Sequence, residues 1–424
     1  MTLELKTTPM HAWHKAHHAN MSDFAGFDMP LWYETGIKKE HFAVLQSAGI
    51  FDTSHMSCIR VSGPDAFNLL NYCFTRQLSA LLPGQCTYGA FLDTNGFCID
   101  DAVIYKFDPT LFMVCVNAGM GAIITDHLKH HSAKTTANVS VTYLSSKIAK
   151  IDIQGPASAR ILSHLIADSE SIFAKFPYFS FKGYMDSLFS QESLFKSNSV
   201  KLMDHTHILL SRSGYTGEFG FEIFLPSETA FSFWENIIQT GKEFDAIACG
   251  LGARDSLRTG ACLPLSHQDI GVFKFIRHPW ESALPFNSDK TGFTKSFSGD
   301  LALLNTDTDV FYTYPFIGNS LKKTGTGNQS QVLDQNSQVI GAVLTCATDM
   351  AIDWLDQKIV SINTPDLPCG YQIKGLSCGF IKVSKKLAPG TPVTLTDGKR
   401  TINVTITTKI RPDTSARKKI NRFI

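Results

Sequence analysis

The sequence of 424 residues predicts an α+β protein with an all-β C-terminal domain, and three patterns lead to that prediction. Residues 88–105 form a hairpin pattern, in which a Thr-Asn-Gly turn joins two runs rich in β-branched and aromatic side chains. A strand, a Gly-Pro pair and a helix follow one another twice, at Gly63 and again at Gly155. From about residue 306, short strand patterns alternate with polar turns and no helical pattern appears, which is typical of a sandwich or a barrel.

Helix and strand patterns alternate through the first part of the chain. The segment 36–49 has apolar side chains at helical spacing and ends at Gly49, as a helix C-terminus commonly does. A helix is also expected at 66–73, because Pro64 and Asp65 are favoured near a helix N-terminus. In order, we expect a helix at 8–20, an extended segment at 22–33, a helix at 36–49, a strand at 57–62, a helix at 66–73, the hairpin at 88–105, a strand at 111–117 and a helix at 120–131.

A second α+β block begins at about residue 140. Three glycines within seven residues predict a tight turn into the strand that contains Glu222. Apolar side chains at helical spacing predict a helix at 229–241. The expected order is a strand at 140–143, a strand at 150–154 and its following helix, a strand at 207–212, the turn and strand at 213–224, the helix at 229–241, a helix from 251, and then strands at 310–317, 338–344, 359–362, 379–383 and 393–396.

The composition argues against several classes of protein. Lys and Arg number 39 and Asp and Glu 38, so a net charge of +1 provides no field for nucleic acid or an anionic membrane. A signal pattern and a run of membrane-spanning length are both missing, so we expect a cytoplasmic protein. Ten dispersed cysteines are typical of thiols in a reducing compartment. Histidines cluster at 11–18 and 127–131 without a Cys or carboxylate partner in fixed register, so no metal site is expected.

Asp100 and Asp101 stand side by side in an otherwise apolar strand pattern. Successive side chains of a strand point to opposite faces, so one of the two carboxylates must face the interior. A buried carboxylate is costly unless it is paired, protonated or bound to a polar group, and that cost predicts a site. The alternative is that one Asp is solvated and the other accepts a hydrogen bond from a neighbouring backbone amide.

Arg254 and Arg258 follow a glycine-rich helix entry and are four residues apart. They would share a face of the helix and could together hold a carboxylate or a phosphate. Surface ion pairs are the alternative for both. The segment has neither the third glycine of a dinucleotide fingerprint nor the pattern of a P-loop. An acidic strand and a cationic helix together suit an anionic heterocyclic ligand, without naming the reaction.

Seven segments follow the order and spacing of motifs in the glycine cleavage system T-protein (aminomethyltransferase) family, which the chain therefore resembles over nearly its whole length. They lie at 23–33, 49–56, 95–101, 116–117, 154–156, 213–222 and 250–255. The resemblance implies an α+β fold in a three-domain cloverleaf, with two intertwined α+β domains and a C-terminal β-barrel around a central hole that binds tetrahydrofolate. The folate-binding region would be 1–305, in which 1–55 joins 150–245 and 56–149 joins 246–305, and the barrel would be 306–424.

The resemblance also implies roles for single residues. Asp101 matches the family's essential acid, beside the reactive edge of the folate. Glu222 matches a carboxylate that accepts hydrogen bonds from the pterin amino group and a ring nitrogen. The other matches are pterin-lining residues at Tyr88, Val103 and Tyr105, an apolar contact at Met56, a polar wall residue at Asn117 and a cation near the glutamyl tail at Arg254.

The chemistry implied by the resemblance is one-carbon transfer. An aminomethyl group on the lipoyl arm of a carrier, the H-protein, loses ammonia while its carbon passes to tetrahydrofolate. Positioning of the folate against the electrophilic carbon would contribute much of the rate. Asp101 would stabilise positive charge on the folate nitrogens or relay a proton.

The sequence departs from the family pattern where the one-carbon donor would bind. Ser266 and His267 stand in place of the usual Tyr and Gly, and residues 273–281 also differ. A second hypothesis is therefore a tetrahydrofolate-dependent demethylase that takes methyl from an O-, S- or N-methyl small molecule. His267 and Trp280 are then candidates for the donor pocket, although a structural histidine and a core tryptophan are equally good interpretations.

A third hypothesis is a non-enzymatic folate-binding relative that assists iron–sulfur assembly. That subgroup carries a Lys-Gly-Cys-Tyr-x-Gly-Gln motif, and the spacing from Cys262 to Gln268 does not match it. The Asp-Asp hairpin is retained, so this hypothesis ranks last.

Overall fold

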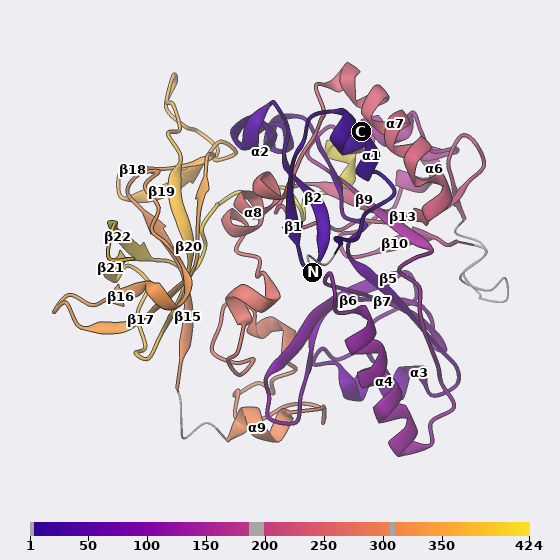
Figure 1. Cartoon of the computed structure of the whole chain (residues 1–424), viewed down its shortest axis with the longest axis horizontal. Coiled ribbons are helices and arrows are strands. Elements are labelled where there is room, and N and C mark those ends of the chain that lie inside the picture. Colours follow the sequence, from indigo (N-terminus) through magenta and orange to yellow (C-terminus); the bar gives the residue numbers. More distant parts are fainter. Residues whose placement is uncertain (1–3, 186–198, 306–309) are drawn as a thin grey trace.

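The computed structural model describes residues 4–185, 199–305 and 310–424 (Figure 1). Within them the chain forms two α+β bodies, one on a seven-stranded sheet and one on a five-stranded sheet, together with a closed six-stranded β-barrel. Figure 1 shows the barrel on one side of the molecule and the two α+β bodies on the other. The predicted α+β class and the terminal barrel are confirmed.

The seven-stranded sheet combines the start of the chain with its middle. Its order is β10-β12-β13-β9-β3-β14, with β11 paired to β12. Strands β9 and β13 pair antiparallel in a register that sets Glu222 opposite Asp152. The members are β3 (Gly49–Asp52), β9 (Ile148–Gln154), β10 (Phe181–Gly183), β11 (Val200–Lys201), β12 (His207–Ser211), β13 (Gly220–Pro226) and β14 (Ile247–Ala248), and the helices that pack on them are α1 (His11–Ala16), α5 (Ser158–Ser163), α6 (Ser169–Phe173) and α7 (Ala230–Gly241).

The five-stranded sheet has the order β5-β6-β7-β4-β8 and is antiparallel throughout. Its strands are β4 (Ser57–Ser62), β5 (Gln85–Leu92), β6 (Cys98–Asp108), β7 (Leu111–Val116) and β8 (Ser140–Tyr143). Helices α3 (Ala66–Cys73) and α4 (Gly121–Thr135) cover one face of it with apolar side chains. The predicted hairpin is β5–β6, and its turn depends on Gly96, whose φ of 81° favours glycine.

The barrel closes through pairing of its first and last strands, β15 with β22. Its order is β15-β20-β17-β16-β21-β22. Aliphatic and aromatic side chains from all six strands fill the interior. The strands are β15 (Tyr312–Gly318), β16 (Gln331–Leu333), β17 (Val339–Asp349), β20 (Leu376–Val383), β21 (Pro392–Thr396) and β22 (Thr401–Ile406), and a separate hairpin is formed by β18 (Ile352–Leu355) and β19 (Lys358–Ser361).

The segments that connect these bodies bear on the predicted domain division. Helix α8 (Leu251–Gly260) packs against α2 (Gly36–Gln46), against β17 and against β2 (Phe27–Trp32), which pairs with β1 (Asn20–Phe24). Strand β14 pairs with β3. Residues 247–260 therefore contact both the first α+β body and the barrel, while the sequence-based division groups 246–305 with the second body. The apolar face of α8 packs against α2, and later residues such as Phe275 and Leu303 pack with Leu92 of the hairpin.

Short helical turns complete the connections. They are η2 (Ser227–Thr229), η3 (Lys242–Phe244), a π-helical turn η4 (Ser266–Ile270), η5 (Glu281–Ala283), α9 (Asp300–Leu304), η6 (Gly327–Gln329) and η7 (Ile420–Arg422). The start of the predicted barrel domain, residues 306–309, lies outside the described residues. As a division into domains, the predicted boundaries stay a proposal.

A buried ion cluster joins the barrel to the first α+β body. Arg411 follows the last barrel strand, and its Nη1 lies 2.6 Å from Oδ2 of Asp349 at the end of β17. The Nε of Arg411 lies 3.2 Å from Oε1 of Glu218, which precedes β13. His41 of α2 approaches the same Asp349, with 3.2 Å between Nε2 and Oδ1. The barrel is thus fixed against the α+β region by charges that are sealed from water.

Candidate active site

A cavity of about 780 Å³ lies between the β5–β6 hairpin, strand β13, helix α8 and the segment 263–283. Its volume is within the range of small-molecule sites. Most of the residues that the sequence singled out line it, namely Met56, Tyr88, Asp101, Val103, Asn117, Glu222, Arg254 and Trp280. The fold therefore brings together motifs that are far apart in the sequence.

Both carboxylates of the Asp-Asp pair are buried, although the sequence required only one inward side chain. Asp101 accepts hydrogen bonds from the Tyr88 hydroxyl, at 2.8 Å, and from Nδ2 of Asn117, at 2.6 Å. Asp100 accepts from the Asn117 backbone N–H, at 2.9 Å, and from the same Nδ2, at 2.7 Å. Because Asn117 directly follows β7, the end of that strand supplies one carboxamide that bridges the two acids.

Burial raises the pKa of both acids. For Asp100, desolvation is the largest cause and the charge of Asp101 adds to it, while the hydrogen bonds from Asn117 oppose the shift. For Asp101, desolvation again raises the pKa, and the hydrogen bonds from Tyr88 and Asn117 and the charge of His267 oppose it. Two carboxylates this close titrate as a pair that retains one proton. We infer that Asp100 holds the proton and that Asp101, which lines the cavity, carries the charge.

In the wild type we expect the free energy of unfolding to fall as the pH rises from about 4 to neutral. We expect this fall to be absent in Asp100→Asn. In the wild type the folded pKa of Asp100 is raised above its unfolded value, so the stabilisation is present below about pH 4 and is lost as the pH rises through the folded pKa. An amide at this position has no proton to lose and still accepts one hydrogen bond from Asn117. Melting temperatures of both proteins across this pH range would test the prediction, and parallel curves would rule out the shared proton.

Glu222 belongs to a chain of buried charges along β9 and β13. Its Oε1 lies 2.6 Å from Nζ of Lys150, which is also 2.5 Å from Oδ1 of Asp152. The other oxygen of Asp152 lies 3.1 Å from Nη1 of Arg254. Ser213 donates a hydrogen bond to Oε2 of Glu222. Oε1 and Oε2 therefore have protein partners, yet the carboxylate still lines the cavity and can accept further hydrogen bonds from a ligand.

Neighbouring opposite charges keep Lys150 and Asp152 ionised. Burial lowers the pKa of Lys150, but the carboxylates of Asp152 and Glu222 outweigh burial and raise it. Burial likewise raises the pKa of Asp152, but the cations of Lys150 and Arg254 outweigh it, so the net shift is downward. The Glu222 carboxylate is thus fixed in place by the Lys150 cation behind it, which is an arrangement suited to binding N–H donors.

The two arginines of α8 are not surface ion pairs. Arg254 stacks on the ring of Tyr215, with 4.6 Å from its guanidinium carbon to the ring centroid. Arg258 is 1% exposed and donates hydrogen bonds to Asp255, Asp269 and Thr345. Each arginine thus has its own buried carboxylate, and the pair does not form one shared anion site.

Comparison with known proteins agrees with this geometry. The family model described as the GCVT N-terminal domain matches residues 10–284, more than half of the chain. The chain belongs to the T-protein family. An aminomethyltransferase of Caldanaerobacter subterraneus subsp. tengcongensis is 35% identical over 349 residues, which are 80% of this chain and 84% of that protein. An aminomethyltransferase of Staphylococcus epidermidis is 34% identical, over 81% of this chain and 86% of that protein.

A solved structure of the T-protein family shares the fold. The crystal structure of glycine cleavage system aminomethyltransferase T from Bartonella henselae aligns with a TM-score of 0.74 and 24% identity, covering 98% of this chain and 99% of that one. Membership of the T-protein family identifies the chain as a T-protein-like transferase. None of the helices in the described part of the chain has both the length and the apolar character to cross a membrane.

In the described part of the structure, Tyr105 is not one of the residues that line the T-protein cavity. The sequence predicted that it contacts the ligand ring. It lies two residues beyond Val103 on the same face of β6 and is buried deeper, edge-on to Phe181 and Phe224 at 5.4 and 5.5 Å between ring centroids. Its hydroxyl donates to Oε2 of Glu222 at 3.4 Å. Tyr105 therefore supports the carboxylate from behind.

The two donor-side candidates differ in their surroundings. The side chain of His267 is 59% exposed and is absent from the cavity wall as described, so its expected place in a donor pocket is not supported. It lies on the π-helical turn η4, with Nε2 3.7 Å from Oδ1 of Asp100. Trp280 does line the cavity and is 6% exposed. Its Nε1 donates to the Cys262 carbonyl at 2.8 Å, and its ring packs edge-on to Phe380.

Lys150 and Asp152, which fix Glu222 in the T-protein site, were not among the residues predicted from the sequence. A signal was present, because Lys150, Asp152 and Gln154 alternate with isoleucine in a strand. All three polar side chains therefore share one face and are buried, which requires partners for them.

Proposed function

We propose that this chain is a tetrahydrofolate-dependent aminomethyltransferase that releases ammonia and transfers a one-carbon unit to the folate. The observation that carries the proposal is that Asp101 and Glu222, from two different α+β bodies, both line one cavity. The family membership supports the transferase class, and the cavity chemistry supports the substrate.

The lining fits a reduced folate in two ways. The ionised Glu222 accepts hydrogen bonds, which matches the amino group and ring N–H of a pterin. Met56 and Val103 add apolar surface beside it. Arg76 and Arg417 also line the cavity, and no ion pair to either is found among the described residues. With Arg254, these arginines would hold the carboxylates of the glutamyl tail.

Asp101 is proposed as the catalytic residue. When bound, tetrahydrofolate supplies the nitrogen that accepts the one-carbon unit. The Tyr88 hydroxyl and the Asn117 amide hold the Asp101 carboxylate toward the cavity. There it stabilises positive charge that develops on the folate nitrogens or accepts a proton from them. The protonated Asp100 behind it limits how much negative charge the pair carries.

The donor is proposed to be an aminomethyl group on the lipoyl arm of a carrier, the H-protein. Leu263, Pro264 and Gln268 line the cavity, and Gln268 is exposed to solvent, so we place the entry of such an arm beside Gln268. The departures from the family pattern begin in this same segment, so a methylated small molecule is the competing donor that the experiment must include.

A folate-dependent assay that compares donors tests this proposal. The full chain is given tetrahydrofolate with either the aminomethylated lipoyl carrier or a panel of O-, S- and N-methyl compounds. We expect methylenetetrahydrofolate and ammonia with the carrier alone. Turnover only with the methyl panel would replace the proposal with a demethylase, and folate binding without turnover on any donor would replace it with a non-enzymatic folate protein.

A further inference from the structure

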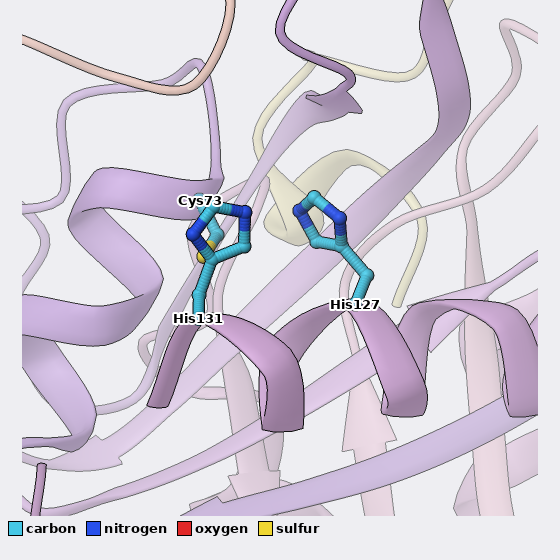
Figure 2. A group of neighbouring side chains, drawn as sticks. All are labelled: Cys73, His127 and His131. Carbon is cyan, nitrogen blue, oxygen red and sulfur yellow. The ribbon is translucent and has the colours of Figure 1, made fainter. Parts of the chain in front are cut away.

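Helices α3 and α4, which cover one face of the five-stranded sheet, bring three metal-binding side chains together (Figure 2). They are Cys73, the last residue of α3, and His127 and His131 of α4. Their candidate ligand atoms, one sulfur and two ring nitrogens, all lie within 4.8 Å of one another. In the part of the chain that the structure describes, none of these three residues lines the proposed folate cavity.

The local sequence explains the convergence. His127 and His131 are four residues apart, so they project from the same face of α4, as Figure 2 shows. Their ring centroids are 4.7 Å apart at an interplanar angle of 62°. The C-terminus of α3 packs beside this face and places the buried thiol of Cys73 next to both rings.

The ring of His127 has a buried nitrogen, Nε2. This atom has no hydrogen-bond partner among the residues that the structure describes. A buried polar atom without a partner is destabilising and calls for an explanation, such as an ion. No Asp or Glu belongs to this group among the described residues, so hard cations that need oxygen ligands are poor candidates.

We propose that Cys73, His127 and His131 bind a zinc ion, with water as the fourth ligand. One sulfur and two imidazole nitrogens are a ligand set that zinc prefers. With bonds of about 2.0–2.3 Å, tetrahedral ligand atoms lie roughly 3.3–3.8 Å apart, so no pair in the group has to close by more than about 1.5 Å. On binding, a zinc–sulfur bond replaces the S–H bond and the thiol proton passes to solvent.

The zinc ion would fix the end of α3 to the middle of α4. His127 lies edge-on to Phe91 of β5, with 6.1 Å between ring centroids, and Phe91 also packs on Phe74. The ion would therefore stabilise the layer of side chains behind the hairpin that carries Asp101. The sequence predicted no metal site because Cys73 is remote from the histidines in the chain, and only the fold supplies the third ligand.

Cobalt and zinc titrations of the full-length, fully reduced chain test the proposal. We expect one cobalt ion per chain, with a thiolate-to-cobalt charge-transfer band in the near ultraviolet, and displacement of the cobalt by zinc. Zinc should also raise the melting temperature, because it binds only the folded state. Cys73→Ala should lose the charge-transfer band, and His131→Gln should weaken zinc binding by more than about tenfold.

His130→Ala is the matched control, because His130 is an exposed neighbour on the same helix that is not in the ligand group. It should bind cobalt and zinc as the wild type does. His131→Gln is a substitution at a partly exposed position, so it tests the site even if Cys73→Ala fails to fold. A wild type without the thiolate band, or the same zinc affinity in wild type and His131→Gln, would overturn the zinc site.

Discussion

Asp101→Asn is expected to slow one-carbon transfer severely while leaving the binding of reduced folate within a few-fold of the wild type. The amide has nearly the shape of the carboxylate and can still accept hydrogen bonds from Tyr88 or Asn117, so the cavity keeps its form. It cannot carry the negative charge or accept the proton that we assign to Asp101. General acid–base groups contribute about 10²–10⁴-fold to rate, and we expect kcat to fall in that range. Single-turnover kinetics and equilibrium folate binding measure the two effects separately.

Asp126→Asn is the control for this experiment, since Asp126 is exposed on α4 and away from the cavity. It should change neither kcat nor folate affinity. Tyr88→Phe removes the hydroxyl that donates to Asp101 but keeps the acid, so its loss of rate should be smaller. An Asp101→Asn protein with wild-type turnover would remove Asp101 from catalysis, whatever the result for Tyr88→Phe.

Arg411→Met is expected to cause the largest loss of stability, about 3–5 kcal/mol, because it leaves buried carboxylates without their cation. Asp349 and Glu218 are both ion-paired to this guanidinium. Burial alone would raise the pKa of Asp349, but Arg411 and then His41 outweigh burial and lower it to about 2. The stabilisation from this carboxylate is therefore present above about pH 4 and is lost as the pH falls toward 2. Urea denaturation of both proteins at neutral pH measures the difference.

The same series contains its controls. Arg400→Met replaces an exposed arginine of the barrel and should leave the free energy of unfolding almost unchanged. Asp349→Asn in the Arg411→Met background should recover part of the loss, because it removes one of the two uncompensated charges. Equal stability of Arg411→Met and Arg400→Met would mean that the ion cluster does not join the barrel to the α+β region.

The local sequence pattern was sufficient to predict much of the fold. The turn at Gly96 and the β-branched runs on either side predicted β5–β6, and repeated short strands predicted the barrel. Both depend on interactions between residues close in sequence, or on the alternation of side chains within one strand. The same alternation predicted that one of Asp100 and Asp101 faces the interior, and the resemblance to the T-protein family singled out Asp101.

Contacts between distant segments could not be predicted in this way. Tyr105 and Val103 are two residues apart in one strand, so the sequence places both on the same face. Only the packing against the seven-stranded sheet shows that Tyr105 lies behind Glu222. The pairing of β9 with β13 in the seven-stranded sheet sets Asp152 opposite Glu222, and Lys150 bonds to both carboxylates. His267 was chosen for its unusual residue type, and its exposure depends on how η4 sits over the hairpin.

A crystal structure of the chain with a stable reduced folate would show where the pterin binds. We expect the pterin in the cavity, with its amino edge within hydrogen-bond distance of Glu222 and its reactive nitrogen beside Asp101. A pterin bound elsewhere on the molecule, or one whose ring faces neither carboxylate, would contradict it.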